Sequence, residues 1–147
     1  MISIKVKKLV DSAQMPRYAH TGLYGDLAAD LYASSAATLA AAGEPGSTQP
    51  VPTGLAMEFP STHGALVEDR SGLAVRGITT LAGVIDPGYR GEIKVVMTNL
   101  GSTPIDIQVG DRIAQLRIIQ RIEVSFEEAE ELTKAARGSG GFGSTGR

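Results

Sequence analysis

Apolar and polar residues alternate along several short segments of the chain, and this alternation predicts β-strands with one buried face. It runs through residues 2–7, 105–109 and 121–126, because successive side chains of a strand point to opposite faces. Residues 93–97 are apolar at every position except Lys94, which indicates a more deeply buried strand. Eighteen glycines and seven prolines divide the chain into short pieces. Together these features favour an all-β fold of many short strands.

Three segments depart from the strand pattern. Residues 28–42 are rich in alanine, and propensity alone favours a helix there. Residues 43–50 have the composition of a loop, and residues 11–24 are expected to be irregular. The best candidate for a short helix is residues 126–132, with Ser125 as a possible N-cap and four glutamates on a solvated face.

Composition excludes several classes of function. The chain has 147 residues, enough for one domain with a core, and its net charge of −2 provides no broad basic surface for nucleic acid. The absence of cysteine removes disulfides and thiol chemistry and fits a reducing compartment. With only His20 and His63 available, a zinc site is not expected. No stretch reaches the length of a membrane span and no signal peptide is visible, so we expect a cytoplasmic protein.

Residues 83–92 (GVIDPGYRGE) are the most informative stretch. Pro87 and Gly88 predict a tight turn, with the Asp86 carboxylate and the Tyr89 ring beside it. We interpret the segment as a β-hairpin that can hold a small planar ligand and place a base next to it. A hairpin with an ordinary polar turn is the alternative.

The C-terminal residues 137–146 (RGSGGFGSTG) combine many glycines with one arginine and one aromatic residue. They match G-x-G-x-x-G twice, but no strand precedes and no helix follows, so a dinucleotide-binding fold is not indicated. Glycines allow backbone amides to approach phosphate, Arg137 adds charge, and Phe142 offers a face for stacking. The segment is either a flexible end or an arm that closes over a ligand.

Five segments, in order, resemble the five motifs of the trimeric dUTPases. They are residues 28–31 (AADL), 69–74 (DRSGLA), 83–92, 110–116 (GDRIAQL) and 137–146. The resemblance implies a distorted jelly roll of the dUTPase-like β-clip type, with one short helix and a flexible glycine-rich C-terminal arm. It also makes the first part of the alanine-rich stretch a strand that carries Asp30. Residues 1–136 form the β domain in this interpretation, and residues 137–147 form its lid.

The activity implied by this resemblance is hydrolysis of dUTP to dUMP and pyrophosphate, with Mg²⁺ as cofactor and water attacking the α-phosphorus. That reaction limits uracil in DNA and supplies dUMP for dTTP synthesis. The family is homotrimeric with active sites shared between chains. Two alternatives remain: an enzyme related to dCTP deaminase, and a trimeric regulatory or interaction module of the same fold.

The resemblance also assigns roles to individual residues. Asp86 is expected to be the general base, Tyr89 to exclude a 2′-hydroxyl by packing on the deoxyribose, and Asp30 to hold Mg²⁺ through a metal-bound water. The expected substrate-binding residues are Arg70, Ser71, Gly72, Gly83, Ile85, Tyr89, Gln115, Arg137, Phe142, Gly143, Ser144 and Thr145.

Four residues depart from the usual motifs of the family. Ala28 stands where relatives usually have glycine, and Thr80 stands where many have an asparagine that contributes to uracil recognition. Glu68 and Asp69 occupy the place of a proline before Arg70. We expect this extra negative charge to pair with Arg70.

Overall fold

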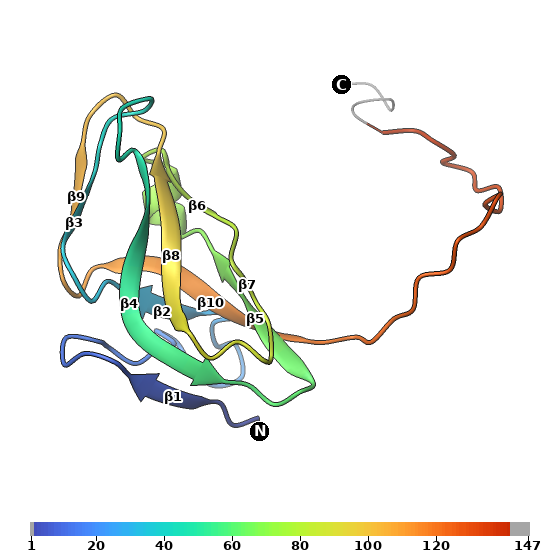
Figure 1. Ribbon diagram of the computed structural model, residues 1–147, viewed down its shortest axis with the longest axis horizontal. Coiled ribbons are helices and arrows are strands. Elements are labelled where there is room, and N and C mark those ends of the chain that lie inside the picture. Colours follow the sequence, from blue (N-terminus) through green and yellow to red (C-terminus); the bar gives the residue numbers. More distant parts are fainter. Residues whose placement is uncertain (1, 142–147) are drawn as a thin grey trace.

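The computed structural model describes residues 2–141, and this part of the chain is almost entirely β-structure (Figure 1). Its elements are β1 (Lys5–Lys8), β2 (Ala29–Tyr32), β3 (Ala37–Leu39), β4 (Thr48–Glu58), β5 (His63–Glu68), α1 (Ser71–Ala74), β6 (Ile78–Leu81), β7 (Val84–Ile85), β8 (Glu92–Asn99), β9 (Ile105–Ile107) and β10 (Arg112–Gln120). The predicted all-β class with one short helix is confirmed. Within this part of the chain, no helix is long and apolar enough to cross a membrane.

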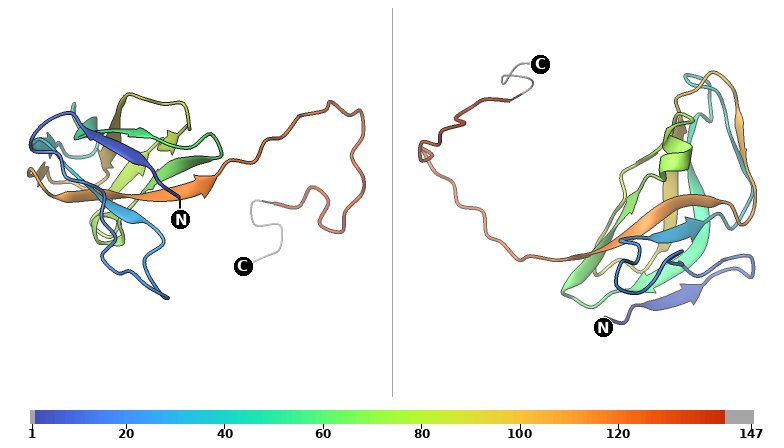
Figure 2. Two further views of the ribbon diagram at one scale, coloured as in Figure 1. Left: turned by 90° about the horizontal axis from the view of Figure 1, so that it is seen from below. Right: turned by 180° about the vertical axis from the view of Figure 1, so that it is seen from behind.

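Two four-stranded antiparallel sheets form the body, in the orders β1-β4-β8-β6 and β2-β10-β5-β7, and β3 and β9 form a third, two-stranded sheet. In the ribbon views β2 and β10 cross β4 and β8 at a steep angle (Figures 1 and 2). One cluster of buried apolar side chains draws on both larger sheets, including Leu31, Val67, Ile93 and Met97. The two sheets therefore pack on each other through their apolar faces.

Residues 93–97 form the middle of β8 as predicted, residues 105–107 form β9, and the strand expected over residues 2–7 begins only at Lys5. In β8, Ile93, Val95 and Met97 are buried while Lys94 between them is exposed. The alanine-rich stretch forms β2 and β3 and not a helix, because burial in a sheet outweighs the high intrinsic helix propensity of alanine. The loop expected over residues 43–50 is shorter than predicted, since β4 already begins at Thr48.

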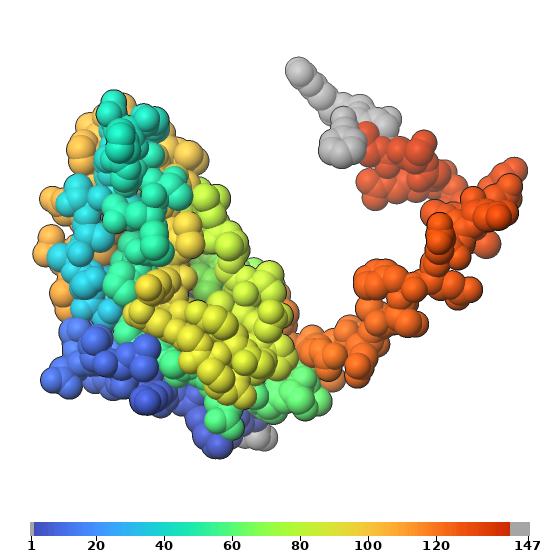
Figure 3. Space-filling view, in the orientation of Figure 1, coloured from blue at the N-terminus to red at the C-terminus, as the bar shows by residue number. Residues whose placement is uncertain are grey.

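Two predictions for the C-terminal region are wrong. Residues 126–132 are not helical, and the alternating segment 121–126 forms no strand. Ile122, Val124 and Phe126 are 79%, 63% and 97% exposed, and the chain runs out of the body after β10 (Figures 1 and 3). A short helix or a lone strand is stable only when its apolar face is buried, and the rest of the described chain leaves this segment uncovered.

The predicted hairpin over residues 83–92 is also wrong in its strand pairing. The turn itself is present, because the Tyr89 N–H donates to the Asp86 carbonyl at 3.1 Å. However, β7 pairs with β5, whereas β8 pairs with β4 and β6. Turn residues specify a reversal of the chain, but which strands then pair depends on tertiary packing.

A buried asparagine ties several loops to the end of β8. Asn99 is 1% exposed. Its Nδ2 donates to the carbonyls of Leu39, Ala40 and Thr103 at 3.3, 3.0 and 2.8 Å, and its Oδ1 accepts from the Gly101 N–H at 2.8 Å. The side chain thereby satisfies backbone groups that lie far apart in the sequence.

Replacing this side chain by an apolar one of similar size tests its role. Asn99→Leu leaves several backbone groups unpaired, and each such group costs about 1–3 kcal/mol when buried. We therefore expect the free energy of unfolding, measured by urea denaturation, to fall by at least about 2 kcal/mol. The exposed neighbour Ser102 provides the control, since Ser102→Ala is expected to change stability by less than about 0.5 kcal/mol. Equal stability of the two variants would contradict this role.

Candidate active site

A cavity of about 420 Å³ opens where the chain leaves β6 and later returns as β8. Its walls come from the turn segment on one side and from β8 on the other. The lining residues are Leu81, Ala82, Gly83, Val84, Ile85, Asp86, Tyr89, Glu92, Ile93, Lys94 and Val96. We refer to this space as the base cavity, because its size and mostly apolar lining suit a nucleobase with its sugar.

The backbone at one end of the base cavity adopts conformations that are rare for residues with side chains. Ala82 has φ +60° and Gly83 has φ +106°. A Cβ at Gly83 would lie 2.5 Å from the Val67 carbonyl oxygen, and the Gly83 carbonyl accepts from the Val67 N–H at 2.8 Å. Only glycine permits this close approach. The bend carries the chain from one sheet to the other and so opens the cavity.

At the other end, the ring of Tyr89 is fixed by its neighbours. Its hydroxyl donates to the Glu92 carbonyl at 2.9 Å. A Cβ at Gly91 would lie 2.5, 2.7 and 3.0 Å from the hydroxyl oxygen, Cζ and Cε2 of Tyr89. The ring therefore packs directly on this glycine. Asp86 lines the same cavity and is exposed, which leaves its carboxylate accessible to a ligand and to water.

A second, polar cavity of about 600 Å³ lies beside β2 and β10, and we refer to it as the phosphate cavity. It contains Arg70, Ser71 and Gln115 from the predicted site together with Arg112 and Arg117. The other lining residues are Ala19, His20, Asp26, Leu27, Ala28, Asp30 and Glu68. Arginine side chains present planar sets of N–H donors, which suit phosphate oxygens.

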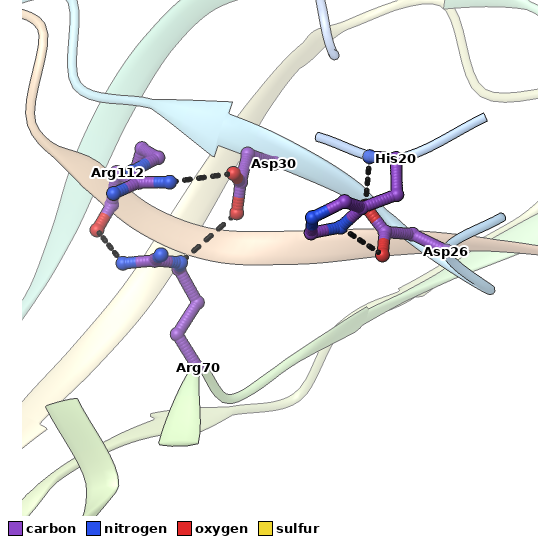
Figure 4. A network of polar contacts seen from close by, with 5 residues as sticks. All are labelled: His20, Asp26, Asp30, Arg70 and Arg112. Carbon is purple, nitrogen blue, oxygen red and sulfur yellow. Dashed lines mark hydrogen bonds and ion pairs between the residues drawn. The ribbon is translucent and has the colours of Figure 1, made fainter. Parts of the chain in front are cut away.

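Asp30 is held between two of these arginines (Figure 4). Its Oδ1 accepts from Arg70 Nε at 2.9 Å and its Oδ2 accepts from Arg112 Nη1 at 3.4 Å. Arg70 Nη1 also donates to the Arg112 carbonyl at 3.3 Å. The Asp30 side chain is 15% exposed, and a carboxylate this buried requires such partners. The three motifs that carry these residues are thus joined by one ion-pair network.

The expected pairing of Glu68 and Asp69 with Arg70 is wrong. Glu68 instead accepts from Arg117 Nε and Nη2 at 2.9 and 2.6 Å, and these hydrogen bonds hold the pKa of Glu68 below its usual value. The side chains of adjacent strand residues face opposite ways. The Glu68 side chain therefore meets Arg117 on β10, while Asp69 turns toward β6.

Asp69 links the end of β5 to β6 and β10 through hydrogen bonds that the sequence did not reveal. Its carboxylate accepts from Thr79 Oγ1 at 2.6 Å, from Thr80 N at 2.6 Å and from Thr80 Oγ1 at 2.8 Å. Burial opposes ionisation of this carboxyl, but these hydrogen bonds prevail and lower the pKa of Asp69. The Asp69 carbonyl accepts from Gln115 Nε2 at 2.7 Å. The hydroxyl of Thr80, at the unusual position noted in the sequence, is therefore engaged by Asp69.

The two cavities share no lining residue, and the strand register explains their separation. Val84 and Ile85 pair with Leu66 and Ala65 of β5, so the antiparallel direction places Asp86 level with Gly64. Arg70 lies six residues further along from Gly64, a distance of ~20 Å at about 3.3 Å per residue. Within one chain, Asp86 and Arg70 therefore stand at opposite ends of β5.

The remaining predicted residues have three different outcomes. Ser71 begins α1 and lines the phosphate cavity, whereas Gly72 and Arg137 line neither cavity. Arg137 is exposed, and its Nε donates to the Gly140 carbonyl at 2.9 Å. The other arm residues, Phe142, Gly143, Ser144 and Thr145, lie outside the described residues.

The fold places the protein in the class of distorted jelly rolls represented by solved dUTPases. The dUTPase of Staphylococcus bacteriophage 80alpha, solved with dUPNHPP, superposes with a TM-score of 0.85 at 23% identity and covers 99% of both chains. A mutant dUTPase of phage phi11 of S. aureus, for which coordination of a structural Mg(II) ion is described, gives 0.76 at 21% identity over 90% of this chain and 99% of that one.

Sequence comparison identifies the family. The dUTPase family model matches residues 14–146, and the chain belongs to the dUTPase family. The deoxyuridine 5′-triphosphate nucleotidohydrolase of Thermobifida fusca (strain YX) is 45% identical over 150 residues, covering 99% of this chain and 79% of that protein. The protein of the same name from Anaeromyxobacter sp. (strain Fw109-5) is 43% identical over 152 residues, covering 99% of both. The resemblance inferred from the five motifs is confirmed.

The contacts of Asp69 predict a pH-dependent contribution to stability. Asp69→Asn should lower the free energy of unfolding at pH 7 by about 1–3 kcal/mol, because an amide replaces an acceptor of three hydrogen bonds. The pKa of Asp69 is lowered in the folded state. Its contribution is therefore complete above about pH 4, the unfolded value, and disappears as the pH falls through the folded value.

Urea denaturation of the native protein and of Asp69→Asn at pH 7, 4 and 3 measures this effect. We expect the two stabilities to converge toward the most acid condition. Glu128→Gln, at an exposed position, is the control and should match the native protein throughout. A difference between native protein and Asp69→Asn that stays constant down to the lowest pH would contradict the role of the carboxylate.

Proposed function

We propose that this protein hydrolyses dUTP to dUMP and pyrophosphate. The observation that carries the proposal is the division of its site into two cavities: Asp86 and Tyr89 border a base cavity, while Arg70, Ser71 and Gln115 line a phosphate cavity. Curated relatives 43–45% identical over 99% of the chain bear the name of this activity. The reaction removes dUTP from the nucleotide pool, which limits uracil in DNA, and it supplies dUMP for dTTP synthesis.

Uracil binds in the base cavity, where the backbone around Gly83 and Ile85 provides the hydrogen-bonding groups that read its edge. Tyr89 packs on the deoxyribose. Its ring packs on Gly91 and its hydroxyl donates to the Glu92 carbonyl, and both contacts oppose its displacement by an additional 2′-hydroxyl. A rigid wall at this position selects deoxyribonucleotides by steric exclusion.

Asp86 acts as the general base in this proposal. A carboxylate within hydrogen-bonding distance of a water molecule orients it and accepts its proton as it attacks the α-phosphorus. Asp86 is accessible and begins a hydrogen-bonded turn at the border of the base cavity. It thereby stands close to the sugar end of a bound nucleotide, where the α-phosphate emerges.

The triphosphate binds across the phosphate cavity. Arg70 uses its Nε on Asp30 and one Nη1 hydrogen on a backbone carbonyl, and further N–H donors of its guanidinium remain for phosphate oxygens. The Ser71 hydroxyl and the Gln115 amide add neutral donors. Neutralising the charge that develops on the leaving pyrophosphate is the main contribution of these groups.

We further propose that Mg²⁺ arrives with the triphosphate. Within residues 2–141, no group of three or more His, Cys, Asp or Glu side chains is arranged to hold a metal ion. Both Asp30 oxygens accept from arginine, but each carboxylate oxygen has a second lone pair. Asp30 therefore fits a metal-bound water better than the ion itself. When bound, Mg²⁺ supplies charge neutralisation at the phosphates.

A complete site requires more than one chain. One dUTP molecule must place its α-phosphate close to Asp86 and its phosphates on Arg70, yet these two residues are separated along β5 by ~20 Å. A second copy that brings its phosphate cavity to the base cavity of the first resolves this conflict. We propose a homotrimer whose sites each combine cavities from different chains.

The exposed C-terminal segment supports assembly. Ile122, Val124 and Phe126 alternate with polar residues and are largely exposed in the single chain, although such a stripe is stable only when it is covered. In the proposed trimer this segment packs on a neighbouring chain.

Residues 137–147 act as a lid on the β domain of residues 1–136. In this proposal Arg137, Ser144 and Thr145 lie near the phosphates, and Phe142 lies over uracil with Gly143 beside it. We also propose that the reaction takes place in the cytoplasm.

A substrate panel tests the function directly. Pyrophosphate release is measured with dUTP, dTTP, dCTP and UTP, and ammonia release with dCTP. We expect rapid turnover of dUTP alone. Asp86→Asn should reduce kcat by about 10²–10⁴-fold, the usual contribution of a general base, while binding of a non-hydrolysable dUTP analogue persists. Ammonia release from dCTP would instead indicate a deaminase, and normal turnover by Asp86→Asn would reject this base.

Co-assembly of two inactive variants tests the shared site. Asp86→Asn and Arg70→Ala, carrying different affinity tags, are produced together, and mixed trimers are purified through both tags. If each site takes Asp86 and Arg70 from two different chains, every trimer that contains both variants has one intact site, or about one third of its sites. Trimers of either variant alone serve as controls. Activity of mixed trimers no higher than theirs would contradict sharing between chains.

A further inference from the structure

A histidine held by an aspartate stands at the border of the phosphate cavity, and none of the five motifs includes it. His20 and Asp26 both line this cavity together with Arg70, Ser71 and Gln115. The His20 side chain is 79% exposed, so its ring is accessible to a ligand. Figure 4 shows the ring on the side of Asp26 that faces Asp30 and Arg70.

The aspartate controls how this ring is oriented. Asp26 Oδ1 lies 3.0 Å from His20 Nδ1, and Asp26 Oδ2 accepts from the His20 backbone N–H at 2.7 Å. These contacts, the backbone one above all, hold the pKa of the Asp26 carboxyl below its usual value. An ionised carboxylate accepts only, so the proton between the two groups resides on Nδ1. Nε2 is left for another partner.

The backbone of the loop reinforces this arrangement. The Asp26 N–H donates to the His20 carbonyl at 3.0 Å, and the Gly25 N–H donates to the Gly22 carbonyl at 3.1 Å. Gly22 has φ +96°, and a Cβ on Gly25 would lie 3.1 Å from the His20 carbonyl oxygen. The two glycines thus permit the close turn that brings Asp26 back to His20.

We propose that His20 binds the triphosphate of dUTP through Nε2, with Asp26 as the residue that positions its ring. This inference rests on the proposed function. With Nδ1 already protonated, Nε2 donates to a phosphate oxygen only after it takes up a second proton. Binding of the triphosphate is therefore coupled to proton uptake by this imidazole. The other charged groups that line the cavity are Asp30, Glu68, Arg70, Arg112 and Arg117, and each of the two carboxylates is paired with arginine.

Binding measurements on the full-length protein test the proposal. The probe is a non-hydrolysable α,β-imido analogue of dUTP, titrated calorimetrically between pH 6 and 8, the range in which imidazole changes its charge. His20→Asn should weaken binding at pH 6 by about five- to tenfold, as expected for one accessible charge-assisted hydrogen bond. It should have little effect at pH 8, so that the native protein has a steeper pH dependence than the variant.

Three comparisons distinguish phosphate binding from a purely structural role of the loop. Deoxyuridine, which has no phosphate, should bind the native protein and His20→Asn equally well. Repeating the titration in buffers with different ionisation enthalpies should show less proton uptake for His20→Asn, although the nucleotide's own protons contribute equally in both. Asp26→Asn keeps the imidazole but not its orientation, and binding of the analogue should weaken.

His63 provides the matched control, because its ring contacts the neighbouring Thr62 at 2.8 Å and lines neither cavity. His63→Asn should preserve both affinity and pH dependence. The proposal is overturned if His20→Asn binds the analogue with native affinity and pH dependence while Arg70→Ala weakens binding. Failure of the native protein to hydrolyse dUTP would instead reject the proposed function, so the two failures are distinguishable.

Discussion

The position of β5 between β7 and β10 is the constraint on which the rest of the site depends. Pairing with β7 places Asp86 level with the beginning of β5, and pairing with β10 places Gln115 beside its end, next to Asp69 and Arg70. Because strands are stiff and rise by a fixed amount per residue, these groups cannot approach one another within one chain. The same pairing pulls residues 83–85 away from β8 and opens the base cavity between them.

The phosphate cavity is organised before any ligand binds. Each acidic side chain on its wall has a basic partner: Asp26 pairs with His20, Asp30 with Arg70 and Arg112, and Glu68 with Arg117. These contacts hold the arginine side chains in place and still leave N–H groups for a ligand. Ordering long side chains costs conformational entropy. Here most of that entropy is lost when the chain folds, and less is lost when a ligand binds. Asp69 extends this order to β6 and so to the border of the base cavity.

The single chain leaves one apolar stripe uncovered, and the proposed assembly covers it. The stripe of Ile122, Val124 and Phe126 has the pattern of a strand but no partner strand among the described residues of its own chain. The alternating pattern of this segment thus indicates that it is stable only beside a sheet edge and against an apolar surface. Whether that surface is supplied by the same chain or by another is decided by topology, because β10 ends at Gln120 and the following residues run away from the core.

Much of the site could be predicted from residue order alone. The position of β8 follows from its run of apolar residues, and Asp86, Arg70 and Gln115 are marked by motifs whose chemistry suits a nucleotide. The sequence also determined that the Pro87–Gly88 turn forms, since its conformation depends on the turn residues themselves. It could not determine the pairing of β7 with β5, the partners of Glu68 and Asp69, or the contact of His20 with Asp26 beside the phosphate cavity. Those features depend on which distant backbones lie side by side, and only the packing of the two sheets decides this.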